Sequence, residues 1–106
     1  MADGTKPSHF QRIQAEYPQL ISAVEHLGDA ARTAGPLDAR TTHLIQLAAA
    51  AAIRSEGALH SHVRRALAAG ASEAEIRHAV VSLTSTIGFP TVTAALSWVD
   101  DVFEKR

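Results

Sequence analysis

Apolar residues recur every three or four positions along most of this chain, which is the spacing that places them on one face of an α-helix. No stretch shows the strict alternation of apolar and polar residues that is typical of a half-buried strand. The pattern predicts an all-α fold with five to six helices, over residues 8–17, 18–34, 39–53, 57–69, 73–87 and 91–103. The number depends on Pro18, which either begins the second helix or kinks a helix that continues from the first.

Several helix ends carry capping residues. Asp38 is a good N-cap for the third helix, because its carboxylate can accept hydrogen bonds from the free N–H groups of the first turn. Ser72 and Glu75 form an S-x-x-E capping box that begins the fifth helix, shortly after Gly70 ends the fourth. Gly88-Phe89-Pro90 separates the fifth helix from the last.

The second and third helices differ in how much of their surface is apolar. The second is amphipathic, with a polar face carrying Glu25, Asp29 and Arg32 and an apolar face made of Leu20, Ile21, Val24, Leu27 and Ala31. In the third, every residue from Leu44 to Ile53 except Gln46 is apolar. We therefore expect the third helix to be buried on most of its circumference, at the centre of the domain.

The length and composition indicate one small domain. We expect a disordered tail over residues 1–8 and one helical domain over residues 9–106. Twenty-one alanines and few aromatic residues make much of the apolar content small, so each buried side chain contributes little. A chain of this kind is expected to complete its core by forming homo-oligomers.

Charge and cysteine content exclude several classes of function. Ten Lys and Arg against eleven Asp and Glu leave a formal net charge of −1, which does not favour nucleic acid as a partner. We expect no membrane segment and a cytoplasmic protein, because there is no long apolar run and no signal-peptide core. The absence of cysteine excludes disulfides, thiolate metal sites and thiol catalysis.

Three segments together, Gly35–Ala52, Ser55–Ser72 and Gly88–Pro90, resemble the carboxymuconolactone decarboxylase family, which also contains the alkylhydroperoxidase D-like proteins. The similarity runs from about Phe10 to the C-terminus and is strongest from Gly35 to Leu96. The resemblance implies an alkylhydroperoxidase D-like helical domain and homo-oligomers, typically trimers or hexamers.

The redox members of this family carry the motif C-x-x-C-x-x-x-H. Aligning the family histidine on His62 places Ser55 and Ala58 at the two cysteine positions, and the family's acidic relay residue falls on His43. Because the thiolate is the nucleophile in thiol peroxidase and disulfide reductase chemistry, the sequence argues against both activities.

His62 and His43 are the candidate catalytic residues. Ser55, Ala58 and His62 share one helix face, so the positions that match the redox groups still converge. An imidazole with an ordinary pKa near 6.5 suits proton transfer, and we expect His62 to face a small cavity lined by alanine. The alternatives are a His62 that bonds a carbonyl or a partner subunit, and a His43 that is solvated or at an interface.

Arg54 and Arg65 are candidate substrate-binding residues, together with Ser55. Decarboxylation without a cofactor needs a cation to hold the substrate's carboxylates, and an acid to protonate the carbanion or enolate left when CO₂ leaves. His62 as proton donor, with Arg54 or Arg65 as the clamp, meets both needs. The alternative is that these arginines are solvated or paired with Asp and Glu.

We expect no metal and no cofactor. His60 and His62 point about 200° away from each other on a helix, so they cannot chelate one ion. Glu56 and His60, four residues apart, could share one, although Gly57 between them favours an unwound turn. His43 and His62 are the better pair for a metal, provided that they converge.

Two hypotheses of different classes follow. The first is a cofactor-independent decarboxylase, or a related proton-transfer catalyst, acting on a small carboxylated lactone-like molecule, as the family name implies. The second is a non-catalytic helical oligomer that binds a small ligand or a partner protein through the retained pocket.

Overall fold

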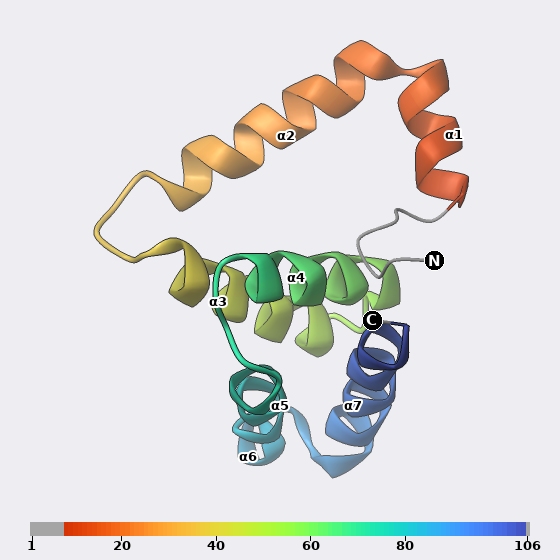
Figure 1. Ribbon diagram of the computed structural model, residues 1–106. Coiled ribbons are helices and arrows are strands. Elements are labelled where there is room, and N and C mark those ends of the chain that lie inside the picture. Colours follow the sequence, from red (N-terminus) through yellow and green to blue (C-terminus); the bar gives the residue numbers. More distant parts are fainter. Residues whose placement is uncertain (1–7, 106) are drawn as a thin grey trace.

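The computed structural model describes residues 8–105. Within this range there are six helices of nine or more residues, one four-residue helical segment and no strand (Figure 1). They are α1 (Ser8–Glu16), α2 (Pro18–Arg32), α3 (Ala39–Ala52), α4 (Glu56–Ala68), α5 (Glu73–Val81), α6 (Thr84–Ile87) and α7 (Phe89–Glu104). The predicted all-α fold is confirmed. The predicted tail lies outside the described residues except for Ser8, which begins α1.

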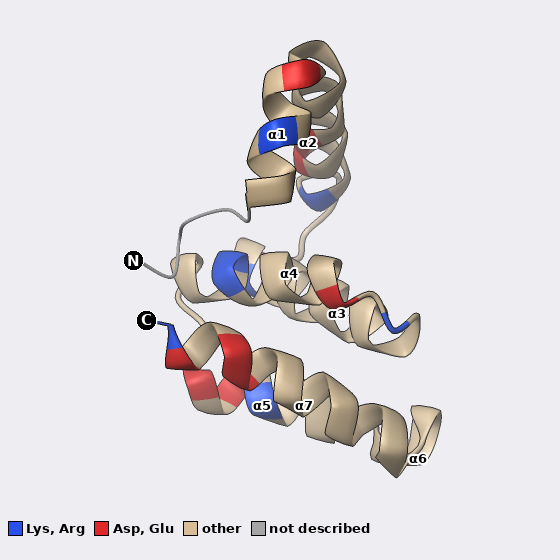
Figure 2. Ribbon diagram, turned by 90° about the vertical axis from the view of Figure 1, so that its right-hand side faces the viewer, with Lys and Arg blue, Asp and Glu red and all other residues tan. Residues whose placement is uncertain are grey.

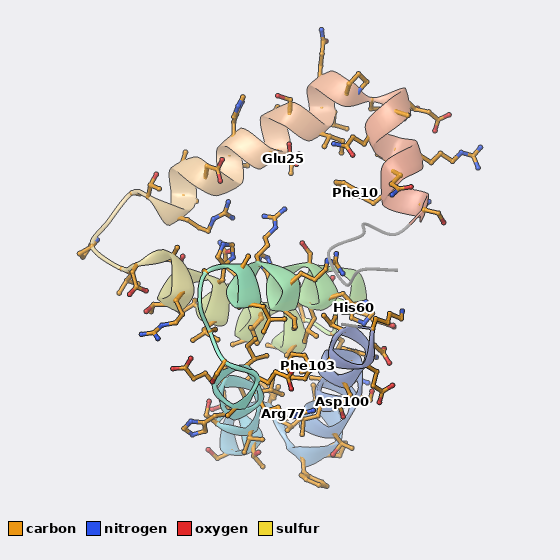
Figure 3. The ribbon with its side chains drawn as sticks, viewed as in Figure 1. Phe10, Glu25, His60, Arg77, Asp100 and Phe103 are labelled. Carbon is orange, nitrogen blue, oxygen red and sulfur yellow. The ribbon has the colours of Figure 1, made fainter. Side chains whose placement is uncertain are left out.

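The core lies where α3 and α4 pack side by side and α5 and α7 pack against them (Figure 1). The largest fully buried side chains come from all four helices: Leu47, Leu59, Val63, Ile76, Val80, Val92 and Val99. Alanines such as Ala51, Ala66 and Ala95 fill the spaces between them and have no exposed surface. On the outside, Arg77 of α5 lies over the Phe103 ring of α7 and pairs with Asp100 (Figure 3), so the same two helices also interact at the surface.

The helices α1 and α2 form an arm (residues 8–32) that lies over α3 and α4 and is joined to them through residues 33–38 (Figure 1). The amphipathic pattern predicted for α2 is present, but its apolar face does not meet the core of the same chain. Leu20, Val24 and Leu27 are 57, 55 and 70% exposed, and Ile21 is the one residue of α2 that is buried. The side of α2 that carries Glu25 and Arg32 is the less exposed one.

The expectation that α3 is buried on most of its circumference is wrong for the single chain. Ile45 is 51% exposed, and Ala49 and Ala52 on the same face are exposed as well. The neighbouring helices α4, α5 and α7 cover the opposite face, which carries Leu47, Ala50 and Ala51. The apolar run from Leu44 to Ile53 therefore predicts more burial of α3 than the helices of one chain provide.

The predicted caps are confirmed, and one predicted helix is interrupted. The Asp38 side chain accepts a hydrogen bond from the Thr41 N–H, and Ser72 and Glu75 form the reciprocal capping box. The helix predicted over residues 73–87 stops at Val81, where the hydroxyls of Ser82 and Thr84 donate to carbonyls three residues back. Gly88, at φ 91°, turns the chain into α7, a conformation that favours glycine.

Candidate functional site

The structure brings His43 of α3 and His62 of α4 together. Their ring centroids are 5.9 Å apart and the ring planes are inclined at 41°. His43 is the one buried polar or charged residue in the described part of the chain, at 8% exposure. The two predicted catalytic histidines therefore form one pair, held by the packing of α3 against α4.

The pair carries polar atoms that the fold does not satisfy. The Nδ1 atoms of His43 and His62 are both buried, and neither has a hydrogen-bond partner among residues 8–105. A buried nitrogen without a partner costs about 1–3 kcal/mol, so most proteins do not keep one for stability alone. Two of them on facing rings mark the pair as a candidate site.

Both imidazoles are held in the uncharged form. Burial, helped by the positive charge of Arg65, lowers the pKa of His62 to about 4, and His43 and Arg32 add to the effect. Burial, followed by the charges of Arg32 and Arg65, also lowers the pKa of His43, while Asp29 opposes the shift. At neutral pH each ring is therefore neutral, with one nitrogen able to accept a proton.

A cleft of about 360 Å³ lies between α2 and α4. Neither His43 nor His62 lines it, but two of its lining residues, Arg32 and Arg65, act electrostatically on both imidazoles. The expectation that His62 faces a small cavity lined by alanine is wrong for this cleft, because its lining contains neither His62 nor alanine and is largely charged: Glu25, His26, Asp29, Arg32 and Arg65. Figure 3 shows Glu25 on the side of α2 that faces α4. The cleft therefore lies between the polar face of α2 and the arginine-bearing part of α4.

The two arginines of this cleft differ in what they contact. Arg32 pairs with Asp29 one turn earlier on α2, and its side chain is 12% exposed. Arg65 has no carboxylate partner in the described part of the chain. Arg65 is thus a guanidinium that lines a cleft with its hydrogen-bond donors available to a ligand.

Two of the predicted substrate-binding residues lie elsewhere. Arg54, at φ 58°, lies after the end of α3, and its Nη1 donates to the Thr91 hydroxyl at 2.9 Å. Ser55 is the N-cap residue of α4 and makes no side-chain capping hydrogen bond. Arg54 lies eleven positions after His43, and the nine residues of α3 that follow His43 alone span about 14 Å along the helix axis. Of the predicted arginines, the structure brings Arg65 to the histidine pair.

Sequence reasoning did not single out the contribution of α2. The polar face of Glu25, Asp29 and Arg32 was recognised, but not as part of a site, and the exposed His26 beside it also lines the cleft. The signal in the sequence was the polar stripe at i, i+4 and i+7. Its meaning depended on the arm folding back over α4, which no local pattern specifies.

The charges around the pair favour an anion over a cation. Arg32 and Arg65 lower the pKa of both imidazoles, so they would also repel a metal ion bound there. The same two guanidinium groups suit a carboxylate, which accepts paired hydrogen bonds from arginine. The cleft also carries the carboxylates of Glu25 and Asp29, so an acidic molecule would be held through the two guanidinium groups that also act on the two neutral rings.

Comparison with known proteins identifies the family. Residues 18–101 match the model of the carboxymuconolactone decarboxylase family. A Haemophilus influenzae protein, named only as an uncharacterized protein, is 40% identical over 57 residues, which are 54% of this chain and 50% of that protein. The chain thus spans about half the length of the curated relative it matches. Because the family model covers residues 18–101 of 106, the chain belongs to the carboxymuconolactone decarboxylase family.

Proposed function

We propose that the protein is a cofactor-independent decarboxylase, or a related proton-transfer catalyst, for a small carboxylated lactone-like molecule that binds in the cleft between α2 and α4. The observation that carries the proposal is the Arg65 guanidinium, which has no carboxylate partner among residues 8–105, lines the cleft and acts on two facing, uncharged imidazoles. Family membership supports the class of reaction.

Arg65 is the proposed carboxylate-binding residue. Its donors are not used by any carboxylate among residues 8–105, so a ligand need not displace a partner from it. Arg32 can give a second contact only by sharing its hydrogen bonds with Asp29. Because Arg54 donates to Thr91, and Ser55 is the N-cap of α4 near the far end of α3, the proposal gives neither residue a substrate contact.

Ligand binding itself prepares the acid that the reaction needs. The charge of Arg65 is one cause of the low pKa of His62, and a bound carboxylate offsets that charge. His62 then takes up a proton together with the ligand. When the substrate's C–C bond breaks and CO₂ leaves, the electron pair stays on the substrate as an enolate, and the imidazolium of His62 protonates it at carbon.

His43 is the second proton carrier in this scheme. Its ring faces that of His62, and its own pKa is lowered by the same arginines. Only one of two facing rings can hold a charge at low cost, so a proton on one is shared with the other. The pair therefore works as one base before the reaction and one acid during it.

A binding protein without turnover is the second candidate, and one observation favours it. A His62 pKa of about 4 leaves little imidazolium at neutral pH, so a ligand that raises the pKa only slightly would bind without being protonated. In that case the same cleft would hold dicarboxylates or tricarboxylates and release them unchanged.

Release of CO₂ from carboxymuconolactone by protein purified without an affinity tag tests the proposal. Wild type should turn the compound over, while His62→Gln and Arg65→Gln should lose at least about 100-fold in rate, the scale of a lost general acid. Arg12→Gln, which removes an exposed guanidinium from α1, is the matched control. Binding without CO₂ release supports the second candidate. If the protein neither binds the compound nor releases CO₂ from it, both candidate functions are ruled out.

We also propose that the chain forms homo-oligomers, as trimers or hexamers. The support is the arm, whose α2 presents Leu20, Val24 and Leu27 to solvent while its polar side faces its own chain. Ile45 and Ile53 add exposed apolar surface on and after α3. Apolar helix faces of this kind are ordinarily covered by another surface.

A further inference from the structure

We propose that Glu56, His60 and Asp101 form a binding site for one divalent metal ion of the zinc class, where the beginning of α4 meets the end of α7. The site is separate from the cleft between α2 and α4. His60 and His62 lie on different faces of α4, so one meets α7 and the other meets α3.

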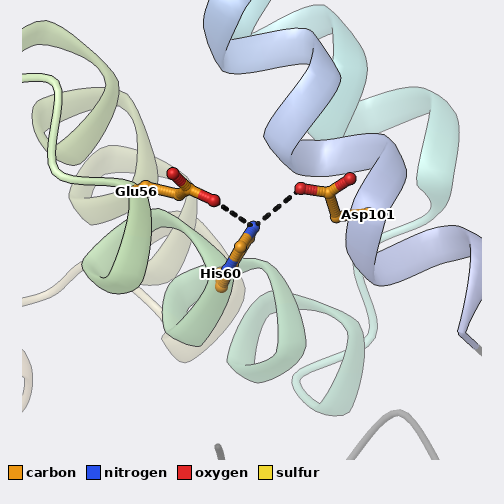
Figure 4. Close-up of side chains that lie close together, drawn as sticks. All are labelled: Glu56, His60 and Asp101. Carbon is orange, nitrogen blue, oxygen red and sulfur yellow. Dashed lines mark hydrogen bonds and ion pairs between the residues drawn. The ribbon is translucent and has the colours of Figure 1, made fainter.

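The three side chains already converge (Figure 4). Nε2 of His60 lies 3.3 Å from Oδ2 of Asp101 and 3.9 Å from Oε2 of Glu56, and the three ligand atoms are all within 4.8 Å of one another. In a tetrahedral site with metal–ligand distances of about 2.0–2.2 Å, neighbouring ligand atoms lie about 3.4 Å apart. His60 and Asp101 meet this spacing, and a small movement of the exposed Glu56 side chain completes it.

The backbone supports this geometry. Glu56 is the first residue of α4, and the helix continues through Gly57 without unwinding, so Glu56 and His60 are one turn apart on one face. Asp101 is held opposite them because α7 packs against α4 through the core. The ligands therefore come from two helices whose relative position the hydrophobic core fixes.

The charges of the cluster favour a cation. In the described part of the chain, the ion pairs of Glu56 and Asp101 go to His60 alone, whereas Asp100 and Glu75 each pair with an arginine. Figure 2 shows acidic residues gathered near the C-terminal end of α7 and the beginning of α5. Two carboxylates so close to each other gain from a divalent ion between them.

The ligand set selects among cations. Imidazole is a good ligand for zinc and similar transition metals, whereas magnesium and calcium prefer sites made of oxygen alone. Three protein ligands leave a fourth position for water, as in zinc sites that are not fully closed. The positive charges of Arg32 and Arg65 act on His43 and His62 and disfavour a cation there. The metal is therefore assigned to His60 and its two carboxylates.

The test is a titration of untagged, chelator-treated protein with Zn²⁺, followed by calorimetry and by metal analysis after dialysis. Wild type should bind one equivalent, and its melting temperature should rise with Zn²⁺ concentration, because the metal binds the folded state. Glu56→Gln and Asp101→Asn should each weaken binding by at least about tenfold. Both side chains are about half exposed, so the variants should fold.

Two controls locate the ion. Glu104→Gln removes an exposed carboxylate from the same end of α7, and His62→Ala removes the histidine of the other pair; both should still bind one equivalent. The proposal is overturned if wild type takes up no stoichiometric Zn²⁺, or if Glu56→Gln and Asp101→Asn bind as tightly as wild type. If His62→Ala is the one variant that loses Zn²⁺ binding, the metal lies at His43 and His62, and the proposal is overturned as well.

Discussion

The rings of His43 and His62 face each other with their centroids 5.9 Å apart, and the Nδ1 atom of each is buried without a hydrogen-bond partner among residues 8–105. Two positive imidazoles at this distance would repel each other, so the contact favours uncharged rings. Burial and the charge of Arg65 keep them so at neutral pH. The protonation state of this pair therefore affects the stability of the fold, the binding of a ligand and the proposed proton transfer.

Acid should destabilise the fold through this pair. In the unfolded chain the imidazole of His62 is protonated below its ordinary pKa of 6.5, whereas in the folded chain it is protonated only near pH 4. The unfolded state binds more protons in that window, so the free energy of unfolding should fall as the pH falls from about 6.5 to about 4. A pKa shift of one unit corresponds to about 1.4 kcal/mol. The shift of His62 therefore changes the free energy of unfolding by at most about 3 kcal/mol, and by less where solvent screens the ring.

Urea unfolding at pH 7 and at pH 5 measures this dependence. His62→Gln should lose much less stability than wild type between the two values, because the ring that resists protonation is gone. His78→Gln, which removes an exposed imidazole from α5, is the matched control. If both variants lose as much stability as wild type, the pair is not the origin of the acid sensitivity.

Arg65 should dominate the binding of carboxylates in the cleft. Its loss in Arg65→Gln removes charge-assisted hydrogen bonds worth about 1.5–3 kcal/mol, which corresponds to binding that is about 10-fold to 100-fold weaker. Calorimetry with tricarballylate, a simple tricarboxylate, gives the dissociation constant. Arg12→Gln should bind like wild type. Equal affinity in all three proteins would mean that the cleft is not the carboxylate site.

The apolar face of α2 should control the oligomeric state. Replacing Leu20 and Leu27 together by Ser removes two side chains that are more than half exposed in the single chain, so the fold should survive while the assembly weakens. Light scattering should show the mass falling from a multiple of 11.3 kDa towards one chain. Val81→Ser, on α5, is the control for an exposed apolar residue outside the arm. A wild type that is itself monomeric would disprove the proposed oligomer.

The capping box at the beginning of α5 should contribute measurably to stability. The Ser72 hydroxyl accepts from the Glu75 N–H at 3.0 Å, and the Glu75 carboxylate accepts from the Ser72 N–H at 2.9 Å. Ser72→Ala removes the first bond and should lower the free energy of unfolding by about 1 kcal/mol. Ser82→Ala, whose exposed hydroxyl bonds a carbonyl of its own helix, should change it by less than half as much.

Local signals in the sequence were enough to predict the helices and their caps. The Asp38 and Ser72 caps act within four residues, so they depend on little outside their own turn. The break after Val81 was missed because Ser82 and Thr84 are compatible with a helix interior and end it only through hydroxyl bonds to nearby carbonyls.

The site was only partly predictable. His43 and His62 were predicted from the family motif, and the packing of α3 against α4 brings them together. Arg32 was missed because it reaches the pair from the arm, across a turn whose direction depends on tertiary contacts. Arg54, one of the two arginines expected to hold a carboxylate, follows the end of α3 that lies farthest from His43.

The most direct measurement is an NMR pH titration of the His62 ring, made with and without a saturating tricarboxylate. The account predicts a pKa of about 4 in the free protein, and a clear rise when the ligand offsets the charge of Arg65. A His62 that titrates near 6.5 in the free protein, or whose pKa does not change when the ligand binds, would contradict it.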